Sequence, residues 1–134
     1  MVINNAGFGY CGEFVSSTLE NDLEMIDTNV RAVHILTKLF LKDFVSKNSG
    51  RILNVASIAG FMPGPMMATY YATKNYVTSL SRAVSYELKE MGSAVTVTAF
   101  CPGPVNTEFN QVAGVSFATA SKQNCRKNGY YRRT

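Results

Sequence analysis

The chain has 134 residues and is 46% hydrophobic and 16% charged, with 10 glycines and 4 prolines, which suits one ordinary domain and excludes a disordered, collagen-like or low-complexity protein. Its apolar runs are far shorter than the ~20 residues of a membrane span, and no basic segment followed by an apolar one begins it, so we expect no membrane span and no signal peptide. The net charge is +4, but residues 1–120 carry 8 basic and 9 acidic side chains, which argues against a nucleic-acid partner.

The first predicted elements are a very short strand and a long helix. Residues 1–3 are apolar, and the asparagines and glycines of residues 4–9 indicate that this strand turns into a loop. We place the N-cap of the helix at Ser17, because Glu20 follows at capping-box spacing.

Apolar residues then recur every three or four positions, which predicts an amphipathic helix of about 25 residues. They are Leu23, Ile26, Val30, Val33, Leu36, Phe40 and Phe44. We expect this helix to end near residues 47–50, with Gly50 in the left-handed position after it.

The next segments continue the alternation of strand and helix. Residues 51–57 are an aliphatic run typical of a parallel strand that is buried on both faces. A helix is predicted over about 67–91, ended by Gly92, and a third strand over 94–100. The order strand, helix, strand, helix, strand predicts an α/β fold with three parallel strands, right-handed crossovers and both helices on one face of the sheet.

Ligands of open α/β sheets bind beyond the carboxyl ends of the strands, which here are residues 4–7, 54–57 and 101–107. The second predicted helix adds Tyr70 and Lys74, which are four residues apart and therefore neighbours on one face. An ammonium group beside a phenol favours the phenolate, which a tyrosine of ordinary pKa, about 10, needs for proton exchange near neutral pH.

Tyr71 is the poorer candidate for that chemistry, because Asn75 takes the place of a lysine at the same offset. Three further motifs accompany Tyr70 and Lys74: Asn-Asn-Ala-Gly at 4–7, Asn29 in the long helix, and Ser57 thirteen residues before Tyr70.

Residues 102–107 add a fourth motif, Pro-Gly-Pro-Val-Asn-Thr. In this order and at these separations the motifs resemble the short-chain dehydrogenase/reductase family in its Tyr-x-x-x-Lys form. The resemblance covers about residues 1–118 and implies a partial, Rossmann-like doubly wound parallel sheet.

The resemblance implies an NAD(P)-dependent oxidoreductase that transfers a hydride between nicotinamide and a small-molecule alcohol or carbonyl substrate, without a metal. Tyr70 would be the general acid/base, and Lys74 would lower its pKa and hold the nicotinamide ribose. Ser57 would bind the substrate oxygen, and the main chain of Asn29 would hold a water of a proton relay. The cofactor-binding residues it implies, beside Tyr70 and Lys74, are Asn5, Ala6, Gly7, Pro102, Gly103, Val105 and Thr107.

Plainer interpretations stay open for several of these residues. Tyr70 and Lys74 could form an ordinary surface pair, and Asn29 could bond a neighbouring loop. His34 has no acid or nucleophile partner in view, so we expect it to be structural or exposed. The family also implies a homo-oligomer for its complete fold, and the alternative function is a non-catalytic fragment or association module that pairs through the two long helices.

Two parts of the family pattern do not occur in these 134 residues: the Gly-rich turn that receives the cofactor pyrophosphate, and the strand that selects NAD or NADP. The choice between NAD and NADP therefore stays open, and we expect the chain by itself to bind the cofactor weakly.

The end of the chain differs in composition, since residues 121–134 carry 5 basic side chains, no acidic one and no periodicity. We expect residues 1–118 to form the partial domain and residues 119–134 a basic, disordered tail. Cys11, Cys101 and Cys125 are an odd, widely spaced set, which argues against a disulfide framework or a zinc site and indicates the cytoplasm.

Overall fold

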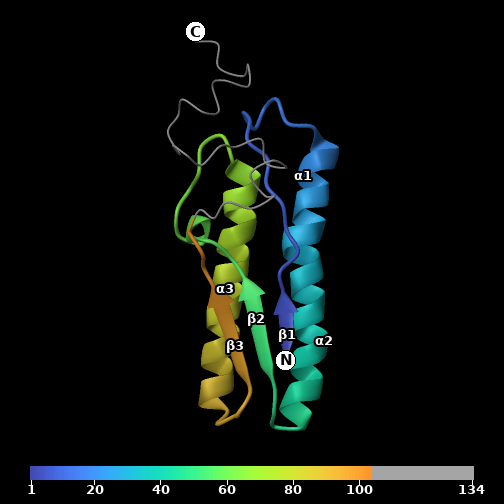
Figure 1. The fold of residues 1–134 in the computed structure, drawn as a ribbon, viewed down its shortest axis with the longest axis vertical. Helices are drawn as coiled ribbons and strands as arrows, with labels where there is room; N and C mark the ends of the chain where they lie inside the picture. Colours follow the sequence, from blue (N-terminus) through green and yellow to red (C-terminus); the bar gives the residue numbers. More distant parts are fainter. Residues whose placement is uncertain (104–134) are drawn as a thin grey trace.

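A computed structural model describes residues 1–103 of the chain. Three parallel strands, β1 (Val2–Asn4), β2 (Arg51–Val55) and β3 (Thr96–Phe100), form one sheet in the order β1-β2-β3 (Figure 1). The predicted α/β fold with a partial, Rossmann-like parallel sheet is confirmed. The predicted domain boundary near residue 118 and the predicted tail lie outside the described residues.

Both connections between the strands run on the same face of the sheet, behind it in Figure 1. The first consists of α1 (Leu19–Ile26), a π-helical stretch η1 (Asp27–Ala32) and α2 (Val33–Ser46). The second consists of a short 3₁₀ helix, η2 (Ile58–Phe61), and α3 (Ala68–Glu90). The sequence predicted the extent of both helices well, but not the π-helical stretch inside the first.

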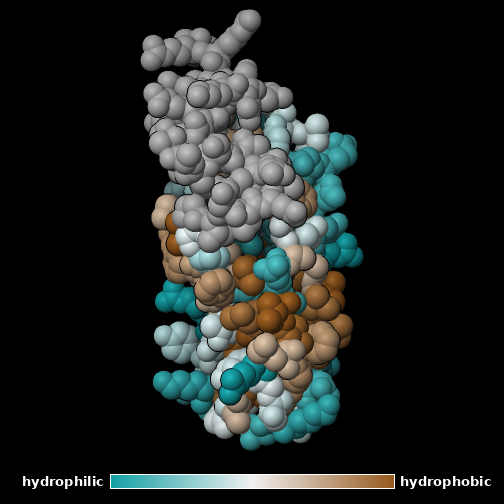
Figure 2. Space-filling view, in the orientation of Figure 1, coloured by the Kyte–Doolittle hydropathy of each residue, from teal (hydrophilic) through white to brown (hydrophobic). Residues whose placement is uncertain are grey.

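The other face of the sheet carries apolar side chains that no described helix covers. Residues that alternate along the strands point to this face, among them Ile3, Leu53 and Phe100, and Ile3 and Phe100 are 51% and 53% exposed. Figure 2, in the orientation of Figure 1, shows hydrophobic residues gathered over the strands. The prediction of one uncovered sheet face therefore holds for residues 1–103.

Between the sheet and the helices lies an apolar core that encloses a group of hydrogen-bonded polar side chains. The core centres on Ile52, Leu88, Val95 and Val97. The polar group, which we call the core network, consists of Asn4, Thr37, Asn54 and Ser81.

In the core network, four elements are joined by side-chain hydrogen bonds alone. Asn4 Nδ2 donates to Asn54 Oδ1 at 2.7 Å and to Thr37 Oγ1 at 3.2 Å, and Asn54 Nδ2 donates to Ser81 Oγ at 2.9 Å. Because Asn4 and Asn54 face the helices, they do not belong to the ligand-binding edge, where their segments were expected.

The N-cap of α1 is Thr18, so the prediction of Ser17 is wrong. The main-chain N–H of Asn21 donates to Thr18 Oγ1 at 3.3 Å, while Ser17 Oγ donates to Asp22 Oδ2 at 2.7 Å. The chain becomes helical one residue later than the capping-box spacing predicted, which gives the serine a side-chain partner inside the first turn.

The end of α2 also differs from the prediction. Asn48, with φ 45°, takes the left-handed position, and the N–H groups of Asn48 and Ser49 donate to the carbonyls of Val45 and Phe44, both at 3.0 Å. The glycine at position 50 is required by space, since a Cβ on Gly50 would lie 2.2 Å from the Phe44 ring.

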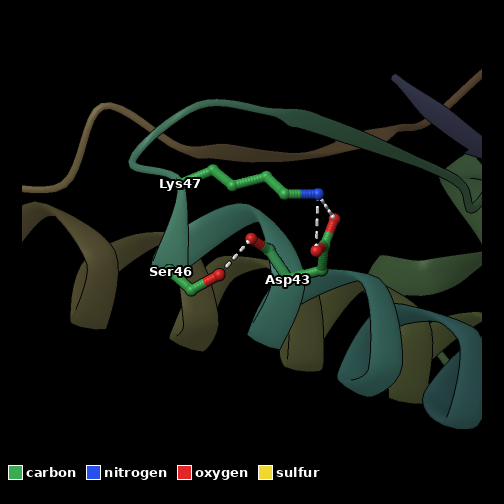
Figure 3. Close-up of polar contacts among 3 residues, drawn as sticks. All are labelled: Asp43, Ser46 and Lys47. Carbon is green, nitrogen blue, oxygen red and sulfur yellow. Dashed lines mark hydrogen bonds and ion pairs between the residues drawn. The ribbon is translucent and has the colours of Figure 1, made fainter.

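Exposed polar contacts complete this helix end (Figure 3). Lys47 Nζ lies 2.7 Å from Asp43 Oδ1, and Ser46 Oγ donates to the carbonyl of Asp43 at 2.8 Å. The ion pair spans one helical turn and is open to solvent, so its contribution to stability is small.

The cysteines differ from the expectation. Cys101 is a free thiol, whereas Cys11 is disulfide-bonded, because cysteines far apart in sequence are not thereby far apart in space. Within residues 1–103, no helix has both the length and the apolar character to cross a bilayer, and no three side chains of the metal-binding types are grouped as ligands.

Candidate functional site

The loops that follow the three strands meet at the carboxyl edge of the sheet. The main-chain N–H of Ala56 donates to the carbonyl of Phe100 at 2.8 Å, and that of Ile58 donates to the carbonyl of Pro102 at 3.1 Å, so the loops after β2 and β3 are joined. Residues 5–7, which follow β1, are exposed beside them. This edge is where the sequence placed the ligand-binding residues.

Tyr70 and Lys74 lie at this edge on the inward side of α3, and only 8% and 6% of their surfaces are exposed. Tyr70 packs against Met25 and Ala59, and Lys74 Nζ lies 5.8 Å from the centre of the Tyr70 ring. An exposed helix pair would leave both side chains in solvent, so the interpretation as an ordinary surface pair is wrong.

Ser57 brings a second hydroxyl to Tyr70. It caps η2, where its Oγ accepts a hydrogen bond from the N–H of Ala59 at 3.1 Å. Burial raises the pKa of Tyr70 above its ordinary value, and the side-chain hydrogen bond with Ser57 opposes that rise in part.

The direction of the Tyr70 pKa is opposite to the lowering expected from the lysine, because burial of the phenol outweighs the other influences. Tyr70 is therefore a neutral phenol at neutral pH in the chain as it stands. A neutral phenol can donate a proton, which is the form that reduction of a carbonyl group requires.

Burial also lowers the pKa of Lys74, to about 8, although the nearby Cys101 acts in the opposite sense. Lys74 Nζ donates to the carbonyl of Val55 at 2.9 Å. An ammonium has three N–H groups, and within residues 1–103 this is its single hydrogen bond, so two donors remain for hydroxyl oxygens of a ligand.

Asn29 connects the π-helical stretch to the loop after β1. Its Oδ1 accepts from the N–H of Phe8 at 3.0 Å, and its Nδ2 donates to the carbonyl of Phe8 at 2.8 Å and to Thr73 Oγ1 at 3.1 Å. The alternative that Asn29 bonds a neighbouring loop is therefore what the structure shows, while its main-chain role stays a prediction.

Two residues of this edge were missed by the sequence analysis, Thr73 and Asn75. Thr73 Oγ1 donates to the carbonyl of Tyr70 at 2.7 Å. We use the name site network for Asn29 and Thr73 together with their main-chain partners at Phe8 and Tyr70. Asn75 Nδ2 donates to the carbonyl of Ala59 at 3.0 Å and so secures η2. Neither contact has a sequence signal, because both partners of each bond come together only in the fold.

The remaining predicted residues divide into those at the edge and those beyond the described part. Pro102 is half-buried and Gly103 exposed at the end of β3, whereas Val105 and Thr107 lie outside residues 1–103. His34 is exposed, as expected, and its Nδ1 lies 2.7 Å from the hydroxyl of Tyr76.

Comparison with known proteins supports a family for this arrangement. Residues 1–115 match the family described as short chain dehydrogenase. The uncharacterized oxidoreductase YvrD of Bacillus subtilis is 40% identical over 108 residues, which are 81% of this chain and 40% of that protein. A 3-oxoacyl-[acyl-carrier-protein] reductase of Synechocystis is 35% identical over 111 residues, 83% of this chain and 44% of that protein.

Solved structures show the same fold. A short-chain dehydrogenase from Sphingobium yanoikuyae, in complex with NADPH, has a TM-score of 0.80 and 32% identity, over 93% of this chain and 50% of that one. A short chain dehydrogenase/reductase from Burkholderia phymatum, in complex with NAD, has a TM-score of 0.77 and 26% identity, over 92% and 43%. The chain thus spans half or less of the length of these four proteins.

Proposed function

Because this chain belongs to the short chain dehydrogenase family, we propose that its carboxyl edge is the proton-transfer and nicotinamide-binding part of an NAD(P)-dependent oxidoreductase that interconverts an alcohol and a carbonyl compound. One observation carries the proposal: the buried Tyr70 and Lys74 lie together with the half-buried Ser57 beside the exposed residues 5–7. The Asn29 side chain binds the main chain of Phe8, the residue directly after this segment.

In this proposal Tyr70 is the general acid for reduction. Its raised pKa keeps the phenol protonated, so it donates a proton to the substrate oxygen as the carbonyl is reduced. Ser57, hydrogen-bonded to the same phenol, donates to the same oxygen and fixes its position. The substrate class is a small alcohol or carbonyl compound.

The residues fit the nicotinamide end of the cofactor, which when bound gives or takes the hydride. Lys74 has two N–H groups that no residue of the described part of the chain binds, which suits ribose hydroxyls, and the exposed residues Asn5, Ala6 and Gly7 lie beside it. Pro102 and Gly103 lie at the same edge, and the family resemblance adds Val105 and Thr107. Since solved relatives hold NADPH in one case and NAD in another, the proposal names no preference.

The test joins residues 1–118 of this chain to the remaining parts of the Sphingobium dehydrogenase, which binds NADPH. We expect the chimaera to oxidise NADPH in the presence of a panel of aliphatic and aromatic ketones. Tyr70→Phe should lower kcat by about 100-fold or more while NADPH still binds. The matched control is Tyr71→Phe, which should keep kcat within about twofold because Tyr71 lacks the lysine partner.

Full activity of the Tyr70→Phe chimaera, or loss of activity only in Tyr71→Phe, contradicts the assignment of Tyr70. A chimaera that folds and binds no nucleotide contradicts the assignment of the nicotinamide site.

A second candidate is a non-catalytic association module, and one observation favours it. The outward face of α2 carries four exposed apolar side chains, Ile35, Leu36, Leu39 and Phe40. Such a stripe suits pairing with another copy of the chain. Sedimentation of the 134-residue chain and of Leu39→Lys separates the two candidates, since loss of self-association in the variant supports pairing, and nucleotide binding by either protein supports the enzyme.

A further inference from the structure

Thr73 lies between the two residues that the proposed function uses on α3, and its side chain points inward. Only 2% of its surface is exposed. Its hydroxyl donates to the carbonyl of Tyr70 at 2.7 Å and accepts from Asn29 Nδ2 at 3.1 Å, so it is satisfied on both sides. A buried hydroxyl with two fixed partners has one orientation.

With this hydroxyl as a partner, the oxygen and both N–H groups of the Asn29 amide are hydrogen-bonded. Its oxygen and one N–H bind the main chain of Phe8, and its second N–H binds Thr73. Without the Thr73 oxygen, one N–H of an amide that is 1% exposed would have no partner, and such a group turns or moves to recover a bond.

The Asn29 amide and the Lys74 ammonium both lie close to Gly7. A Cβ on Gly7 would be 2.9 Å from Asn29 Oδ1 and 3.4 Å from Lys74 Nζ. A movement of Asn29 therefore changes the space around both the loop and the ammonium.

We propose that Thr73 is a positioning residue, whose hydroxyl holds the loop at Gly7 and Phe8 at a fixed separation from the turn of α3 that carries Tyr70 and Lys74. This proposal rests on the proposed function, because the proposed function is what assigns proton transfer and cofactor binding to Tyr70 and Lys74. Thr73 touches neither substrate nor cofactor in this role, and acts through Asn29.

Ser81, two turns further along α3, provides a matched control. Its hydroxyl accepts from Asn54 Nδ2 at 2.9 Å and donates to the carbonyl of Val77 at 2.7 Å, so it makes the same two kinds of bond in the core network. Removing either hydroxyl leaves a buried asparagine N–H unpaired, but of the two asparagines it is Asn29 that lies beside Gly7, which Lys74 also approaches.

The experiment titrates Lys74 by nuclear magnetic resonance in the 134-residue chain with ¹³C-labelled lysine, and Lys74→Met identifies its signal. Tyr70 and Cys101 are the titratable groups near the ammonium, from α3 and from the end of β3. No cofactor or substrate is needed, so this measurement can fail or succeed independently of the chimaera described above.

We expect Thr73→Val to raise the pKa of Lys74 by about 1 from its value of about 8, because water reaches the ammonium when Asn29 and the loop separate from α3. Thr73→Ser, which keeps the hydroxyl, should leave that pKa at the wild-type value. Ser81→Ala should lower the urea midpoint and leave the pKa unchanged. In the active chimaera, Thr73→Val should lower kcat about tenfold with KM for the ketone within about twofold.

An unchanged Lys74 pKa in Thr73→Val, an equal rise in Ser81→Ala, or no rescue by Thr73→Ser overturns the proposal. If Thr73→Val does not fold, Thr73→Ala takes its place, and failure of both to fold shows the hydroxyl to be purely structural and overturns it too. An inactive chimaera combined with the expected Lys74 shifts contradicts the proposed function and leaves the positioning by Thr73 supported.

Discussion

In the core network, the asparagine side chains bind one another and two hydroxyls, whereas in the site network Asn29 binds the N–H and the carbonyl of Phe8 as well as a hydroxyl. In both networks the hydroxyl from α3 also donates to a carbonyl of its own helix. Both networks are buried and both use a hydroxyl of α3. The core network lies within the sheet and helix layers, and the site network lies where a loop meets a helix.

This difference in partners separates two tasks. The asparagine amides of the core network bind side chains, so they can be exchanged together with their partners for apolar residues of similar shape at little cost, because no main-chain group of a loop loses its partner. An amide that binds both the N–H and the carbonyl of one loop residue fixes where that loop lies. The core network therefore secures the pairing of β1, β2 and their helices, and the site network secures the geometry of the edge.

The two regions also differ in charge. The core network contains no titratable side chain, while the edge contains a buried ammonium with a pKa of about 8 and a phenol with a raised pKa. The stability of the core network should thus be indifferent to pH, and that of the edge should not.

The largest expected effect comes from breaking the core network at its centre. Asn54→Leu removes hydrogen bonds to Asn4, Thr37 and Ser81, so that each of these three buried side chains loses a partner. We expect the free energy of unfolding to fall by about 3–4 kcal/mol, measured by urea denaturation. The exposed Asn5, mutated to alanine, is the control and should change it by less than about 0.5 kcal/mol. A loss below about 1 kcal/mol in Asn54→Leu contradicts the importance given to this network.

The next effect tests the charged edge. The folded-state pKa of Lys74 lies below the ordinary value of 10.5, so the unfolded chain binds more protons between pH 8 and 10 and stability rises with pH in that window. We expect the wild type to gain about 2 kcal/mol relative to Lys74→Met between pH 7.5 and 10. Above pH 10 the raised pKa of Tyr70 acts in the opposite sense, so the window ends there.

Parallel pH curves for the wild type and Lys74→Met would show that Lys74 is not a buried ammonium. Asn54→Leu should lower the whole curve and keep its slope, which separates the two regions in one experiment.

A smaller effect is expected from crowding the site network. Gly7→Ala places a Cβ 2.9 Å from Asn29 Oδ1, so the loop or the amide must shift, and we expect a loss of about 1 kcal/mol in urea denaturation. Gly103→Ala is the control, because among residues 1–103 no atom lies within 4 Å of a Cβ there. Equal stability of the two variants would mean that the loop at Gly7 moves to make room for the methyl group without lowering the free energy of unfolding.

The smallest expected effect comes from an exposed ion pair, whose contribution to stability can be compared with that of the two buried networks. Lys47→Ala removes the exposed ion pair with Asp43, and we expect a loss of about 0.3–0.5 kcal/mol that disappears in 1 M salt. Lys42, an exposed lysine of α2 without an ion pair in the described part of the chain, is the control. A loss above about 1 kcal/mol in the free energy of unfolding would mean that this exposed pair contributes as much as a buried hydrogen bond.

The sequence predicted those features that depend on local periodicity or on one helix turn. The alternation of strands and helices follows from residue patterns, and the nearness of Tyr70 to Lys74 follows from their spacing of four. Both features can be predicted without knowing which residues are in contact in the folded protein.

Features that depend on tertiary partners were missed or wrong. Thr18, and not Ser17, is the N-cap, because the Ser17 hydroxyl donates to Asp22 instead. The pKa of Tyr70 is raised because Met25 and Ala59 bury its side chain. The role of Thr73 depends on an asparagine 44 positions away, which no local pattern reveals.

The π-helical stretch from Asp27 to Ala32 gives the segment between α1 and α2 one residue more than an ordinary helical turn would hold. Ordinary α-helical turns over the same number of residues would rotate α1 by about 100° about its axis relative to α2. Met25 would then turn away from Tyr70, while Thr37 stayed over the sheet. The wide turns of this stretch accordingly let both halves of the helix face their partners at once, and a change that converted them to ordinary α-helical turns without removing a residue would uncouple the two halves.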